Sequence, residues 1–152
     1  MDLVPQIIKM KKILYYLIQW TWGLPMTLLG LIIFCICKAC KCRHYWYRNA
    51  ICIVLQNDFD GLELGMFFLR GKWSEDVCAH EYGHSIQNLW WGPLFPLIIA
   101  IPSAIRYWYR KFYMKFIYQH TRKKLPPYDA IWFEGQATAL GTKANTNAWS
   151  WL

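Results

Sequence analysis

Two histidines and a glutamate lie within five consecutive residues of this chain, in the segment His80-Glu81-Tyr82-Gly83-His84. Residues four apart on a helix share one face, so both imidazoles can reach a single metal ion. Zn²⁺ is the ion that this spacing favours, and Glu81 is placed to take a proton from a water molecule and later deliver it to a leaving amine. The pattern therefore predicts a zinc site with His80 and His84 as ligands and Glu81 as general base.

A catalytic zinc needs a third protein ligand, and three downstream residues are candidates: His120, Asp129 and Glu134. His120 stands in a basic stretch typical of an exposed loop, and Asp129 follows two prolines, where it can begin a helix. Glu134 lies in the segment DAIWFEGQATALG, which predicts a helix from Asp129 to Gly141. Its face is otherwise made of small residues, so this second helix can press closely on the motif helix. We therefore assign Glu134 as the third ligand.

The residues around the motif predict where its own helix begins and ends. Ser74 is a suitable N-cap, and Glu75 adds negative charge to the first turn, where the helix dipole favours it. Gly92 and Pro93 stop the helix, which is therefore predicted over residues 75–91. Gly83 costs about 1 kcal/mol relative to Ala inside a helix, and this favours the close approach of another helix or of a strand.

The spacing His80-Glu81-x-x-His84 followed by Glu134-x-x-Ala137 resembles the gluzincin plan of zinc metallopeptidases, particularly their membrane-embedded branches. The blocks HEYGHSIQ, GPLF, IPS and FEGQATALG are similar to segments of a group of small bacterial membrane proteins, over roughly residues 61–141. The resemblance implies a zinc-dependent peptidase that hydrolyses a peptide or a membrane-protein segment. The alternative is a non-catalytic, zinc-stabilised membrane protein that acts as a regulatory or immunity-type partner.

Two further polar residues bear on the site. Membrane gluzincins often have Asp soon after the Glu-x-x-Ala, where it supports a zinc-bound histidine, but Thr138 stands there in this chain. Thr can accept one hydrogen bond from the ring but brings no charge. Gln87, three residues after His84, either bonds a ligand or a substrate carbonyl or is simply a polar position near the helix end.

The composition indicates a membrane setting. Hydrophobic residues make up 56% of the 152 residues, aromatic residues 18%, and the formal net charge is +8. The basic residues flank apolar runs, which favours anionic lipid headgroups over nucleic acid as their partner. A retained transmembrane helix is predicted from Ile13 to Cys37, because this run can cross a bilayer and is too long for a signal peptide. The expected location is the bacterial cytoplasmic membrane, with the site on the cytoplasmic side because basic residues concentrate at 106–124.

The end of the predicted span carries four closely spaced cysteines, Cys35, Cys37, Cys40 and Cys42. Their spacing leaves two interpretations open, a second metal site or a set of reduced thiols. Basic residues on both sides of the span leave its orientation open as well. The predicted division is a membrane anchor over residues 1–49 and a metallopeptidase-like domain over residues 50–152.

Two β-rich runs, 50–56 and 62–69, predict a hairpin closed by an Asp-Gly turn. The apolar run 93–105 is short for a span, so crossing and re-entry both remain open. Residues 106–116 interleave basic and aromatic side chains and predict a helix lying at the membrane interface. The expected fold class is a mainly α membrane protein with a transmembrane helix, a small β-hairpin, the HExxH helix, an interfacial helical segment and a second metal-ligand helix. Nothing in the sequence indicates an oligomeric state.

Overall fold

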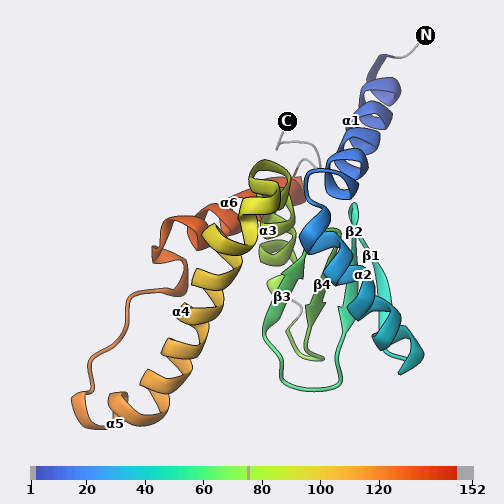
Figure 1. Cartoon of the computed structure of the whole chain (residues 1–152). Coiled ribbons are helices and arrows are strands. Elements are labelled where there is room, and N and C mark those ends of the chain that lie inside the picture. Colours follow the sequence, from blue (N-terminus) through green and yellow to red (C-terminus); the bar gives the residue numbers. More distant parts are fainter. Residues whose placement is uncertain (1–2, 75, 147–152) are drawn as a thin grey trace.

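The computed structural model describes residues 3–74 and 76–146, and it surrounds a small sheet with helices (Figure 1). Short turns of 3₁₀ and π helix join some of the longer elements. The helices are α1 (Leu3–Trp20), α2 (Leu24–Ala39), α3 (Val77–Trp91), α4 (Ile101–Phe112), α5 (Tyr118–Thr121) and α6 (Trp132–Thr146). The strands are β1 (Arg43–Tyr47), β2 (Ala50–Val54), β3 (Gly61–Leu64) and β4 (Phe67–Arg70).

The strands form one mixed sheet in the order β1-β2-β4-β3, which leaves β3 at an edge. The predicted hairpin between runs 50–56 and 62–69 is wrong in its pairing, because β2 and β4 are parallel. The second run is itself a hairpin of β3 and β4, because Gly65, with φ of +71°, turns the chain within it. β1, which pairs antiparallel with β2, was not predicted.

Helices cover both faces of the sheet. Because successive strand residues point to opposite faces, Cys52 and Phe68 are buried on the side of α1, α3 and α6. Ile53 and Phe67 are buried on the other side, against α2. Figure 1 shows α2 in front of the sheet, with α3 on its far side. The sheet is therefore a middle layer, and α3 is held between it and α6.

The prediction of a transmembrane helix over 13–37 is wrong, and with it the expected fold class of a membrane-spanning protein. Within the described residues, no single helix has both the length and the apolar character to cross a bilayer. The predicted span is divided between α1 and α2, which meet at 87°. Pro25 explains the break, because it lacks an N–H and its ring clashes with the carbonyl four residues earlier. A second pair, Val77–Leu94 with Pro96–Thr121, is bent by 116°.

The two bends lie against each other. Gly92, with φ of +49°, packs on the ring of Trp22, where any larger side chain would clash. The Trp22 indole donates a hydrogen bond of 3.5 Å to the carbonyl of Trp90. Beneath this contact, the Asn88 amide donates to Gln19 over 2.7 Å, and both side chains are buried. These contacts fix the corner between α1 and α2 to the end of α3.

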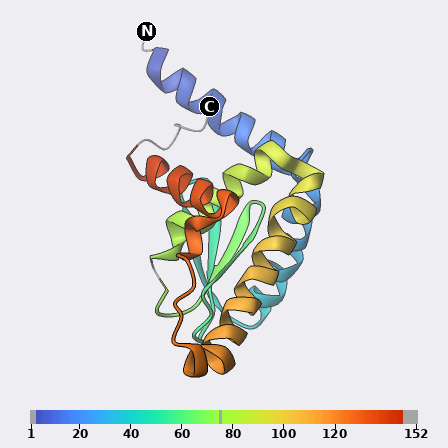
Figure 2. The same cartoon turned by 90° about the vertical axis from the view of Figure 1, so that its left-hand side faces the viewer.

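Residues 96–121 run as one long helical rod through α4 and α5. The rod joins the predicted apolar run 93–105 to the predicted interfacial helix 106–116. Its guanidinium groups bind the chain that returns toward α6, as Arg106 donates to the carbonyl of Tyr128 over 3.1 Å and Arg110 to that of Pro126 over 2.6 Å. Figure 2 shows the returning chain beside the rod. The rod therefore positions Tyr128 and the start of α6.

Candidate metal centre

The motif helix begins slightly later than predicted. The Ser74 hydroxyl, expected as the N-cap, donates instead to the carbonyl of Phe59 over 3.0 Å, and α3 begins at Val77. Glu75, expected in the first turn, lies outside the described residues. The predicted stop at Gly92 is correct, because α3 ends at Trp91 with Gly92 as its C-cap. His80 and His84 therefore stand in the middle of an intact helix.

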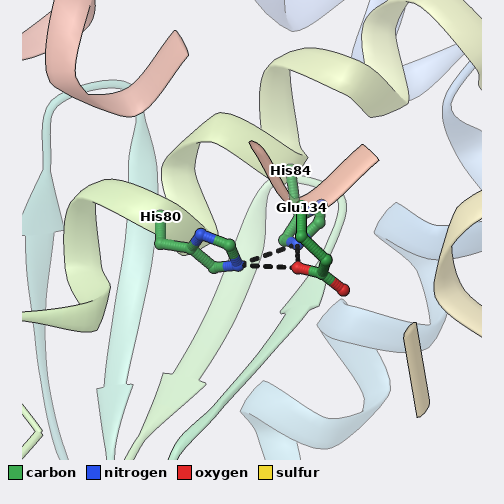
Figure 3. Close-up of side chains that lie close together, drawn as sticks. All are labelled: His80, His84 and Glu134. Carbon is green, nitrogen blue, oxygen red and sulfur yellow. Dashed lines mark hydrogen bonds and ion pairs between the residues drawn. The ribbon is translucent and has the colours of Figure 1, made fainter. Parts of the chain in front are cut away.

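Figure 3 shows His80, His84 and Glu134 converging on one point, with their contacts dashed. The two Nε2 atoms are 3.1 Å apart, and Glu134 Oε2 lies 3.0 Å from His80 Nε2 and 3.2 Å from His84 Nε2. One ligand atom from each residue lies within 4.8 Å of the others. The structure thus brings Glu134 to the two histidines, as predicted, and the three residues could hold a metal ion.

The distances between the three ligand atoms suit a small ion with tetrahedral coordination. Ligand atoms placed 2.0–2.1 Å from a tetrahedral zinc are about 3.3 Å from each other. The other oxygen of the Glu134 carboxylate, Oε1, is buried and has no hydrogen-bond partner among the described residues. A buried carboxylate oxygen left without a donor is costly unless a cation offsets it. The residues present therefore fit zinc, although ions of similar size fit the same ligand atoms.

Small residues allow α6 to approach α3 closely enough for Glu134 to reach the histidines. A Cβ on Gly83 would clash with the backbone of Ala137, and one on Gly141 would clash with the carbonyl of Ala79. This confirms the close approach predicted at Gly83. The predicted bounds of the second helix are wrong, since Asp129 lies in a separate turn and Gly141 is buried inside a helix that runs on to Thr146. These small residues therefore set the distance between α3 and α6 at the site.

Both imidazole rings are held at the nitrogen that points away from the centre. His80 Nδ1 lies 3.0 Å from the Thr138 hydroxyl, so Thr138 does contact the ring, as expected for its position. His84 Nδ1 donates to Gln87 Oε1 over 2.7 Å. The Gln87 amide donates in turn to the carbonyl of Phe133 over 2.8 Å, which turns its oxygen toward the ring. Both Nε2 atoms are thereby left to face the metal position.

Glu81 is buried next to the ligands. Its carboxylate lies against Gly61 of β3, where a Cβ would clash with it. Burial raises the pKa of Glu81 above its ordinary value of 4.5, although the positive charge of His84 and His80 opposes this. A carboxylate with a raised pKa accepts a proton more readily, as a general base near neutral pH requires.

The pKa values of Glu134 and His84 depart from their usual values in opposite directions. Burial would raise the pKa of Glu134, but hydrogen bonds from His80 and His84 outweigh burial and hold it well below its usual range. Burial would lower the pKa of His84, but the Glu134 hydrogen bond and the nearby Glu81 raise it above its ordinary value of 6.5. Without metal, the two shifts favour an ionised Glu134 beside a His84 imidazole that holds a proton more tightly than a free histidine does.

The site forms one wall of a cavity of about 720 Å³. The lining includes His80, Glu81 and His84, and residues of β3 and of the long rod line it as well. The rest of the surface is largely apolar and aromatic. Its side chains of this kind are Phe59, Leu62, Val77, Phe95, Ile99, Ala100, Ala104, Tyr107 and Trp108.

Three polar residues of the cavity were not found by sequence reasoning. The hydroxyls of Ser103 and Tyr128 lie 3.3 Å apart, and burial raises the pKa of Tyr128 to about 12, so its phenol keeps its proton. Burial raises the pKa of Glu63 well above its usual range, and one of its oxygens has no hydrogen-bond partner in the described part of the chain. Glu63 alternates with leucines in β3, a pattern that resembles an exposed position.

The remaining candidates lie elsewhere. His120 is exposed and its ring bonds the carbonyl of Phe116, so it takes no part in the centre. Asp129 lines the cavity but is not a member of the ligand group. The four cysteines at 35–42 do not form a metal-binding group with each other or with other described residues. Across residues 3–74 and 76–146, the group of His80, His84 and Glu134 is the one that could hold a metal.

In comparisons with known proteins, no protein-family model matches the chain, and no curated protein or solved structure is significantly similar to it.

Proposed function

We propose that this chain is a zinc-dependent hydrolase that cleaves peptide bonds. The observation that carries the proposal is the convergence of His80, His84 and Glu134 beside a cavity that both histidines line, with the buried carboxylate of Glu81 next to them. A site that only stabilises the fold has no need of a large cavity or of a base next to the ligands. A hydrolytic site needs both.

His80, His84 and Glu134 would hold the ion. When bound, zinc supplies a Lewis acid that polarises a carbonyl and makes water acidic near neutral pH. Glu81 accepts the proton of the attacking water on its carboxylate and then donates it to the nitrogen of the leaving amine. The protonated Tyr128 phenol lines the same cavity, with its ring centroid 6.2 Å from that of His80, and it is a hydrogen-bond donor for the carbonyl oxygen as negative charge develops on it.

The cavity supports a peptide rather than a small polar molecule as substrate. β3 has a neighbouring strand on one side alone, and three of its residues line the cavity beside Glu81. An extended peptide can pair with such a strand edge through its main chain. The aromatic and aliphatic lining would bind apolar side chains of that peptide.

A structural metal is the second candidate, because the ligands join two helices. His80 and His84 come from α3 and Glu134 comes from α6, so an ion would tie the two together. In this case the protein would bind zinc without turnover and would serve as a partner of another protein. The two candidates differ in the role of Glu81, since a structural metal site does not need a general base.

The variant Glu81→Gln separates them. We expect it to keep the zinc content of the wild type and to lose cleavage of a library of apolar fluorogenic peptides by a factor of about 10² or more. Asp58→Asn is the control, because it makes the same carboxylate-to-amide change at an exposed residue that does not line the cavity. If the wild type binds zinc but cleaves no peptide, the peptidase function is excluded and the structural metal site remains.

A further inference from the structure

The long rod carries a stripe of exposed apolar side chains along its outer face. The residues follow one another at spacings of three or four, so they share one side of the helix. The stripe consists of Leu97, Ile101, Ile105, Trp108, Phe112 and Phe116. Each is between 48% and 69% exposed, although core residues of the same types are buried nearly completely. No part of the described chain covers this stripe, and it extends for roughly 28 Å.

A second stripe runs along α2. Leu24, Leu28, Ile32 and Ile36 recur at a spacing of four and are 39–59% exposed, while Met26 and Gly30 on the opposite side pack against the sheet. The two stripes are related by the contact between the bends, from which α2 and the rod both run downward and diverge to either side of the sheet (Figure 1). Figure 2, turned by 90°, also shows both helices running downward from the bends. Isolated apolar residues on a surface are ordinary, but two continuous stripes indicate a binding surface.

The charged residues of the stretches that carry the two stripes are all basic. The sequence has no acidic residue from position 3 to 57 or from 82 to 128, and every charged residue in these stretches is Lys or Arg. Where α2 ends, Lys38, Lys41 and Arg43 are exposed. Where the rod ends, the exposed basic residues are Lys115, Arg122, Lys123 and Lys124. In the described part of the chain, Lys111, with Asp60 at 3.1 Å, is the one Lys or Arg of these stretches that makes an ion pair.

We propose that the two stripes and the basic residues at their ends form a docking surface for an anionic phospholipid bilayer. The apolar side chains insert among the acyl chains, and the lysines and arginines at the ends of α2 and of the rod bind lipid phosphates. A second copy of the chain is a poorer occupant, because it would bring basic residues against basic residues. Docking goes beyond the hydrolase function and does not depend on it.

The surface also touches the cavity. Trp108 belongs to the stripe of the rod and lines the cavity as well. On a docked molecule, the cavity therefore opens close to the lipid surface. Peptide segments emerging from the bilayer would be within reach of it.

The test is flotation of the full chain with vesicles after cell-free synthesis in their presence. We expect the chain to float with vesicles of phosphatidylcholine and phosphatidylglycerol and to partition at least about tenfold less to phosphatidylcholine alone. The pair Ile105→Glu and Phe112→Glu should lower the bound fraction by about tenfold or more. Its control is the pair Trp46→Glu and Trp73→Glu, two exposed aromatic residues outside the stripes, which should float as the wild type does.

The basic ends are tested separately. Replacing Lys123 and Lys124 by Gln should weaken binding to the anionic vesicles by about thirtyfold, whereas the exposed pair Lys72 and Lys143 should tolerate the same change. Circular dichroism establishes that each variant is folded. Equal flotation with both lipids, or an equal loss in the control pairs, would overturn the proposal. So would failure of the wild type to float while it forms a dimer that Ile105→Glu and Phe112→Glu dissociate.

Discussion

The Nδ1 atom of His80 lies 3.0 Å from the hydroxyl oxygen of Thr138, one turn along α6 from Glu134. The helix that supplies the third ligand therefore also orients the first. A hydrogen bond at the outer nitrogen fixes the ring and leaves Nε2 to the metal. The same contact is neutral, so it orients His80 without adding the negative charge of an aspartate.

Thr138→Val should weaken zinc affinity by about 10- to 100-fold, because His80 loses the hydrogen bond that fixes its ring. Isothermal titration with zinc measures this. Thr142→Val is the matched control, since the Thr142 hydroxyl bonds a carbonyl of its own helix and does not reach the site. Unchanged affinity in Thr138→Val would mean that the contact does not orient the ligand.

Gln87→Met should lower both stability and zinc affinity. The change keeps the size of the side chain but leaves His84 Nδ1 without its acceptor in a buried setting, and it removes the side-chain donor to the carbonyl of Phe133. Each unpaired buried group costs about 1–3 kcal/mol. Chemical denaturation of the metal-free protein measures the first effect, and zinc titration the second. A variant as stable as the wild type would show that water replaces the lost partners.

Gly83→Ala separates helix propensity from packing. Ala favours a helix by about 1 kcal/mol over Gly, so propensity alone predicts a more stable protein. The new methyl group would clash with the backbone of Ala137, and overpacking of this kind costs about 1–3 kcal/mol. We therefore expect a lower melting temperature and weaker zinc binding, because α6 must move away. A higher melting temperature would contradict the close packing of α6 on α3.

Zinc affinity should fall as the pH is lowered. The ion binds imidazole without a proton at Nε2, and the pKa of His84 in the metal-free protein lies above its ordinary value of 6.5. Protons therefore compete from a higher pH than for a free histidine, by up to about tenfold in affinity per pH unit for one proton displaced. Glu134 stays ionised in this range because its pKa is lowered. A zinc affinity that does not change between roughly pH 6 and 8 would contradict proton competition at His84.

The ligands were predictable because their signals are local. His80 and His84 are one helical turn apart in the sequence, and Glu134 is marked by the small residues on its face. Gly83 predicted the close approach that brings these two elements together. Spacing and residue size along single helices were enough for this part of the site.

The rest depends on contacts between distant segments. The run 13–37 is almost entirely apolar, so its hydropathy hid the break that Pro25 introduces. The parallel pairing of β2 with β4 joins strands that are neighbours in the sheet but not consecutive in the sequence, which no turn signal could indicate. Tyr128 reaches the cavity because Arg106 binds its carbonyl, a contact between two segments predicted as separate. Such residues become visible only when the chain is folded.

The most direct test of the central claim is the metal content of the purified full chain, measured by mass spectrometry after exposure to zinc. We predict one zinc ion per wild-type chain, a loss of at least about tenfold in affinity in Glu134→Ala, and no change in His120→Ala, whose ring is exposed outside the site. A wild-type chain that holds no zinc, or a Glu134→Ala variant that holds it as tightly as the wild type, would contradict the assignment of His80, His84 and Glu134 as the ligands.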